Sequence, residues 1–226
     1  METSKTEVLL SCAYLAPVQY FTKFILHDEV WIELREHFLK QSYRNRCTIL
    51  TANGPQSLSI PVTEGSNSKR EMGEVRISYD HPWQKVHWRA LISAYNNAPF
   101  FEYYADSIAP FYNQKKWNYL VDYNLELQKC VLDEIGLKRK FNYTENFISV
   151  RDMSAGMSDF RFSIHPKKNH QIQDPDFVPT EYMQVFQEKF GFTPNLSILD
   201  LLFNEGPQAL QILRRSIPKV TPPILL

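Results

Sequence analysis

Glycine is scarce in this sequence, with 7 residues in 226, and the glycine-rich motifs that cradle phosphates are missing. The nucleophile elbow G-x-S-x-G and the zinc-binding motif H-E-x-x-H are missing as well. The 3 cysteines form no C-x-x-C pair, which excludes a zinc ribbon and a thioredoxin-type redox site. We therefore expect reduced thiols, no metal and no cofactor.

An excess of charge of one sign is also missing, because 25 Lys and Arg residues balance 25 Asp and Glu residues. This balance removes the general electrostatic attraction on which nucleic-acid binding depends, and a small anionic ligand becomes the more plausible partner. No apolar run approaches the roughly 20 residues that cross a bilayer. We expect no nucleic acid, no membrane insertion and a cytoplasmic location.

Hydrophobic and aromatic residues are plentiful, at 43% and 14% of the chain. A chain of this length can bury about 70% of its unfolded surface without a disulfide or a metal. The sequence therefore predicts a single domain over residues 1–226 with a large aromatic core.

The first third of the chain has the pattern of a strand, a helix and a second strand. Residues 8–14 and 30–34 are apolar, and helical spacing follows Pro17 in between. Such a unit normally contains two parallel, adjacent strands. Residues 47–62 contain two further strand patterns around Asn53-Gly54, which predicts a hairpin.

The rest of the chain is mostly helical. The periodicity predicts helices over 82–97 (capped by Asp80), 100–112 and 117–135, and two more between Asn195 or Ser197 and Arg214. Residues 154–181 are polar without periodicity, which predicts a long loop. The fold class expected is α/β, with a mixed sheet covered by helices.

The densest polar segment comes directly after the second predicted strand, where open α/β sheets place their ligands. Glu33 could accept a proton there. The side chains that could grip phosphate or carboxylate, stack on a ring or orient a ligand are Lys40, Tyr43, Arg44, Asn45 and Arg46. In an extended segment Arg44 and Arg46 would point the same way and form a clamp. The alternative is a solvated loop with internal ion pairs.

Tyr14, at the end of the first predicted strand, is expected to line the same concave surface as residues 40–46. His87 shares a helix face with Trp83 and could act as a general base, although a packed histidine is the commoner case. Cys47, next to Arg46, could be a nucleophile or a buried strand cysteine.

Several segments resemble the WbqC-like protein family, in the same order and with similar gaps; they are residues 14–23, 40–46, 59–62, 83–88, 95–101 and 195–204. The resemblance implies a bacterial protein encoded among surface-polysaccharide genes and acting on activated sugars. It implies acyl or aminoacyl transfer to an amino sugar as the reaction. Relatives begin the first block with His-Gln-Pro, whereas this chain has Leu10-Ser11-Cys12-Ala13.

Two functional hypotheses follow from the resemblance and the polar segment. The first is a transferase with Glu33 and His87 as catalytic residues, whose ligand is a nucleotide-sugar or an acyl donor. The second is a non-catalytic ligand-binding or assembly protein in envelope biosynthesis that uses the same concave surface around Tyr14 and residues 40–46.

Overall fold

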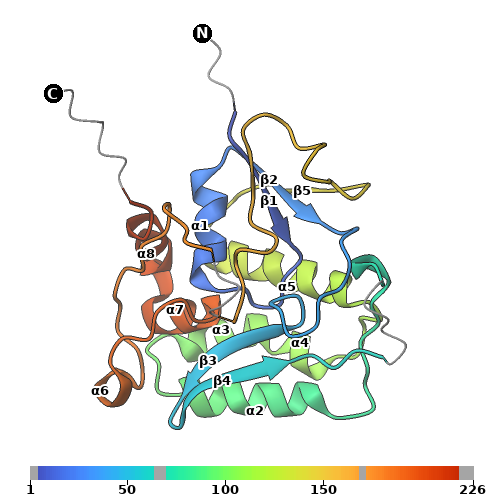
Figure 1. The fold of residues 1–226 in the computed structure, drawn as a ribbon. Coiled ribbons are helices and arrows are strands. Elements are labelled where there is room, and N and C mark those ends of the chain that lie inside the picture. The colour runs from blue at the N-terminus through green and yellow to red at the C-terminus, as the bar shows by residue number, and fades with distance from the viewer. Residues whose placement is uncertain (1–4, 64–69, 168–171, 219–226) are drawn as a thin grey trace, which may run out of the picture.

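The computed structural model describes residues 5–63, 70–167 and 172–218 (Figure 1). Its main sheet has four parallel strands in the order β5-β2-β1-β6, and a separate two-stranded sheet contains β3 and β4. The elements of the main sheet and its crossover helix are β1 (Glu7–Ser11), α1 (Val18–Leu26), β2 (Glu29–Glu33), β5 (Asn142–Tyr143) and β6 (Met157–Asp159).

The predicted strand–helix–strand unit is confirmed. β1 and β2 are parallel neighbours, with Glu7 opposite Glu29 and Ser11 opposite Glu33. The centre of β1 is fully buried, because a parallel strand in the interior of a sheet is covered on both faces. The buried face of α1 packs its aromatic rings behind the two strands.

The polar loop predicted over 154–181 contains a strand. β6 lies within it and pairs with β1 in parallel, with Glu7 opposite Met157 and Leu9 opposite Asp159. A strand of three residues is too short to show a period of two, and its backbone bonds to β1 hold it in place. The described residues between β6 and α7 are otherwise mostly irregular, and residues 168–171 of the predicted loop lie outside the described ranges.

The predicted hairpin is confirmed as β3 (Arg46–Thr51) and β4 (Gly54–Ser59), which pair antiparallel. Gly54 opens β4 with a φ of 100°, a conformation that favours glycine at a tight turn. The α/β fold class is confirmed, and in detail the hairpin forms its own sheet instead of joining the parallel strands. Figure 1 shows α2 beneath this hairpin, where it contacts β3.

The predicted helices are present with shifted ends. They are α2 (Trp83–Tyr95), α3 (Phe101–Ile108), α4 (Pro110–Asn113), α5 (Leu120–Glu134), α7 (Ile198–Glu205) and α8 (Ala209–Arg215), with a short α6 (Gln187–Phe190) and the 3-10 turns η1 (Met72–Glu74) and η3 (Gly206–Gln208). The helix predicted over 100–112 divides before Pro110, which has no N–H to continue the ladder.

Two capping predictions have different outcomes. Ser197 caps α7, because its hydroxyl accepts a bond from the Leu199 N–H at 3.4 Å. Asp80 does not cap α2, because the N-cap residue of that helix is Pro82. The Asp80 carboxylate instead accepts a bond from the Ser78 hydroxyl at 2.7 Å. In the described part of the chain, every helix is too short or too polar to span a bilayer.

Candidate functional site

The carboxyl ends of β1 and β6 lie at a switch point of the sheet, the kind of place where open parallel sheets bind their ligands. The chain leaves β1 on the side of β2, while β6 lies on the opposite side of β1. Where neighbouring strands are connected in opposite directions, their loops diverge and leave a crevice. The switch point between β1 and β6 is therefore the expected position of a site.

A group of charged side chains, here called the edge cluster, lies at this carboxyl edge; its members are Glu33, Glu36, Arg44, Asp159 and Arg161. Arg161 donates to Glu33 at 3.2 Å and to Asp159 at 2.7 Å. Arg44 donates to both oxygens of Glu36, at 2.9 Å for its Nε. Asp159 is 22% exposed, but the other four side chains are almost completely buried, so each of those charges requires its partner.

Glu33, a predicted catalytic residue, is fully occupied by donors of the protein. Its oxygens accept from the Thr144 hydroxyl at 2.6 Å, the Arg35 N–H at 2.8 Å and the Ile148 N–H at 3.1 Å, besides Arg161. These bonds join the ends of β2, β5 and β6. A catalytic role for Glu33 stays a prediction.

The predicted two-arginine clamp is wrong. Arg44 is buried against Glu36, and burial raises the pKa of that carboxyl although Arg44 opposes the shift. Arg46 instead donates from its Nε to the Ser59 hydroxyl at 3.0 Å, across the hairpin. The Arg44 guanidinium that would hold an anion in the clamp is bound to Glu36 instead, because a buried carboxylate needs a counter-charge. Ligand binding by Arg44 and Arg46 separately stays a prediction.

The backbones of the two predicted loops converge, but the side chains of the other predicted binding residues point to different places. The Tyr14 N–H donates to the Tyr43 carbonyl at 2.8 Å. However, the Tyr14 ring points into the core, Lys40 is exposed, and Asn45 donates to the Ile60 carbonyl at 2.9 Å. The roles of these residues in binding stay predictions.

His87 meets Tyr14 in a buried aromatic group. The Tyr14 hydroxyl lies 3.1 Å from His87 Nδ1 and 2.8 Å from the Tyr112 hydroxyl. Burial lowers the pKa of His87 to about 4, so the imidazole is neutral at pH 7. A neutral imidazole can accept a proton only if a substrate reaches it. Its catalytic role stays a prediction.

Of the two alternatives for Cys47, a nucleophile or a buried cysteine in a strand, the structure shows the second. It is fully buried in β3, and burial raises the pKa of its thiol. A protonated thiol is a poor nucleophile. Within the ranges that the structure describes, His, Cys, Asp and Glu side chains form no group of three or more that could hold a metal ion.

A hollow of about 540 Å³, here called the crevice hollow, lies beside the switch point. It is formed by the first turn of α1, the residues after β6, the segment 172–179 and the residues before α7. The side chains that line it are Gln19, Ser163, Ile172, Gln173, Asp174, Pro175, Phe177, Val178, Pro179, Pro194 and Asn195. A volume of this size accommodates a small ligand.

The polar side chains of the crevice hollow bond to one another. Gln19 Nε2 donates to Asp174 Oδ2 at 2.8 Å, and Asn195 Nδ2 donates to Gln19 Oε1 at 3.1 Å. Behind them Lys23, which is completely buried, pairs with Asp174 at 2.6 Å. Asn195 adopts a φ of 56°, which asparagine tolerates better than most residues.

Ser163 also lines this hollow, and its buried Oγ has no hydrogen-bond partner among the described residues. The same segment also borders a second, much smaller cavity of about 10 Å³, which is lined by Tyr43, Arg44, Phe160 and Ile164 among others. That space is enough for about one water molecule. The open part of the switch point is therefore the crevice hollow and not the surface predicted around residues 40–46.

Sequence reasoning missed Gln19, Lys23, Asp174 and Asn195 as site residues. Three of them fall inside segments 14–23 and 195–204; Gln19 and Asn195 lie near helix starts, which was the available signal, whereas Lys23 lies in the last turn of α1. Asp174 had no signal, because its partner Lys23 is 151 positions away in a different element.

The comparisons with known proteins agree over nearly the whole chain. The model of the WbqC-like protein family matches residues 12–165 and 167–212. An uncharacterized protein of Mycobacterium tuberculosis is 26% identical over 221 residues, which cover 89% of this chain and 91% of that protein. Among solved structures there is no match.

Proposed function

This chain belongs to the WbqC-like protein family, which indicates a function related to polysaccharide or O-antigen, and we propose that it binds a sugar in the crevice hollow. The observation that carries the proposal is the hollow at the switch point, which is edged by the bonded polar side chains of Gln19, Asp174 and Asn195.

The lining of the hollow suits a sugar better than a phosphate. The amides of Gln19, Gln173 and Asn195 and the Asp174 carboxylate can each bond to ring hydroxyls. The remaining lining is apolar and includes several prolines, which can face the C–H side of a sugar ring. Among the described residues that line the hollow there is no Lys or Arg, and Lys23 behind it is already paired with Asp174.

The proposed reaction is transfer of an acyl or aminoacyl group from a thioester to an amino sugar. The amine nitrogen forms a bond to the acyl carbon while the carbon–sulfur bond breaks. The amine proton passes to a carboxylate and then to the leaving thiolate, so atoms and charge balance. Of the three acidic or basic groups considered, only Asp174 lines the crevice hollow. Lys23 and Gln19 bond to its Oδ2, so its Oδ1 is the atom that would accept the proton.

A second candidate function is sugar binding without catalysis. It is favoured by the enclosure of the two predicted catalytic residues, since Glu33 and His87 are buried and bonded within the protein. In that case the chain would present or carry a sugar intermediate in envelope biosynthesis.

Replacing Ser163 by leucine tests the site, because the larger side chain would fill part of the hollow without removing any bond of the fold. We expect saturation-transfer NMR to show contact between the parent protein and glucosamine, and Ser163→Leu to abolish it. Ser93→Leu, the same change at an exposed position of α2, should bind like the parent. Equal signals from Ser163→Leu and the parent would refute the site.

The two candidate functions are separated by a turnover assay on the same proteins. Incubation with glucosamine and an acetyl thioester should yield the N-acetyl product, detected by mass spectrometry, for the parent and for Ser93→Leu. Binding of glucosamine without any product would favour the non-catalytic function.

A further inference from the structure

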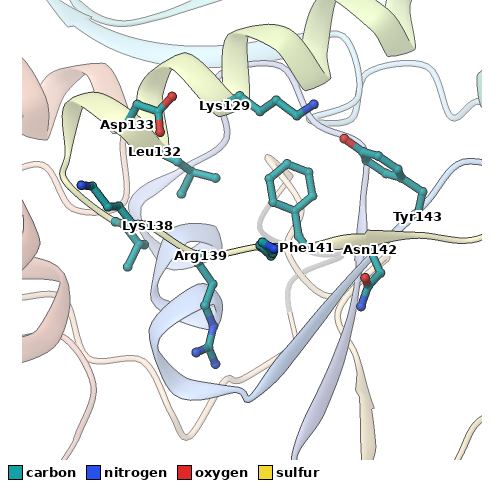
Figure 2. Close-up of a pocket in the computed structure, with 10 residues that line it drawn as sticks. Lys129, Leu132, Asp133, Lys138, Arg139, Phe141, Asn142 and Tyr143 are labelled. Carbon is teal, nitrogen blue, oxygen red and sulfur yellow. The ribbon is translucent and has the colours of Figure 1, made fainter.

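A cavity of about 620 Å³ lies away from the switch point (Figure 2). We call it the α5 pocket. It is formed by the last turns of α5 and the segment that leads into β5, and its lining residues are Lys129, Leu132, Asp133, Leu137, Lys138, Arg139, Lys140, Phe141, Asn142 and Tyr143.

The α5 pocket and the crevice hollow lie toward opposite ends of the strands of the sheet. Phe141 precedes β5, so the pocket lies at the amino end of that strand. Thr144, which follows β5, reaches the edge cluster at the carboxyl end through its bond to Glu33. A ligand in the α5 pocket would therefore occupy a second site, and the inference does not rest on the proposed function.

The pocket carries an unbalanced positive charge. Its lining includes four basic residues and one acidic residue, Asp133. None of the ion pairs in the described ranges involves Lys129, Lys138 or Lys140. Arg139 donates to the His27 carbonyl, and its buried Nε has no partner. Lys129 and Lys138 extend to opposite sides of the pocket (Figure 2), and the four basic residues and Asp133 leave an excess of positive charge around it that attracts an anion.

The floor of the pocket is apolar and contains an aromatic ring. Figure 2 shows the Phe141 ring in the middle of the pocket, with Leu132 beside it and Lys129 extending toward Tyr143. The ring is held by edge contacts with Phe24 and Tyr143, at centroid distances of 5.8 and 5.6 Å. Such a floor favours a ligand with an apolar, flat part over a bare inorganic anion.

We propose that the α5 pocket binds a nucleoside diphosphate, with the base against Phe141 and Leu132 and the phosphates among Lys129, Lys138 and Lys140. The volume falls within the range for ligands of this size. Flexible lysines at the rim can adjust to both phosphates, since each ammonium supplies several donors on a long stem.

Calorimetric titration with uridine diphosphate at low salt tests the proposal. The double variant Lys138→Glu/Lys140→Glu should bind at least roughly ten-fold more weakly than the parent, because charge-assisted bonds are replaced by repulsion. The matched control Lys85→Glu/Arg89→Glu makes the same charge change at exposed positions of α2 and should change the affinity less than about two-fold. Equal weakening in both variants would show diffuse attraction and overturn the site.

Two further titrations test the chemistry of the ligand. Asp133→Asn should tighten binding of uridine diphosphate a few-fold, because it removes the pocket's acidic group. Pyrophosphate should bind several-fold more weakly than uridine diphosphate if the base contacts the floor. Equal affinity for pyrophosphate, or unchanged affinity in Asp133→Asn, would contradict a nucleotide bound in this pocket.

Discussion

Replacing Arg44 by methionine should lower the free energy of unfolding by about 3–5 kcal/mol. The guanidinium is 2% exposed and bonds to both oxygens of Glu36, which is 1% exposed. Methionine preserves much of the volume but leaves the Glu36 carboxylate buried without a counter-charge. The size of the effect comes from that unpaired charge more than from the lost attraction.

Arg46→Met is the matched control, two positions along the chain. Arg46 is only partly buried and makes a single neutral bond to the Ser59 hydroxyl, so its replacement should cost about 1 kcal/mol. In the double variant Arg44→Met/Glu36→Gln neither side chain is charged, and part of the stability lost in Arg44→Met should return.

Urea unfolding of the four proteins, followed by circular dichroism, measures these differences. If Arg44→Met and Arg46→Met lose equally little stability, the buried ion pair does not hold the carboxyl edge together. In that event Arg44 would again be available as a ligand-binding residue.

The second large effect concerns Asp200 of α7, whose carboxylate is 1% exposed. It accepts from the Tyr95 hydroxyl at 3.0 Å, the Tyr182 hydroxyl at 2.7 Å and Gln184 Nε2 at 2.8 Å. Burial raises its pKa to about 6, and these three donors only partly offset the shift. The bonds tie α2, the chain before α6 and α7 together.

Because the folded-state pKa is above the unfolded value, the folded protein binds more protons than the unfolded chain between about pH 4 and pH 6. The contribution of Asp200 to stability is therefore fully present below pH 4 and is lost as the pH rises through 6. A shift of about two units corresponds to roughly 3 kcal/mol.

The comparison of parent and Asp200→Asn isolates this contribution. Between pH 4 and pH 7 the parent should lose about 3 kcal/mol relative to the variant, in unfolding curves at a series of pH values. Tyr182→Phe removes a donor to the carboxylate, so it should raise the pKa of Asp200 further and move the loss to higher pH. A difference between parent and Asp200→Asn that does not vary with pH would contradict the account.

The sequence by itself determined the elements with strong periodicity. The apolar runs 8–14 and 30–34 specify two buried parallel strands, since apolar side chains that continue through a strand require cover on both faces. β1 is shorter than its run and ends at Ser11. The hairpin follows in the same way from Asn53-Gly54, and α2 and α5 from their apolar stripes. Each of these signals lies within one short stretch of chain.

The tertiary structure alone decided which charges are free. Arg44 and Arg46 have the same chemistry in the sequence, but Glu36 takes Arg44 for a buried pair. β6 forms only because β1 presents a free edge, and Lys23 meets Asp174 only when the segment after β6 folds back onto α1. These partners are far apart in the chain or hidden by burial. Charge pairing depends on distance and desolvation, which no local pattern records.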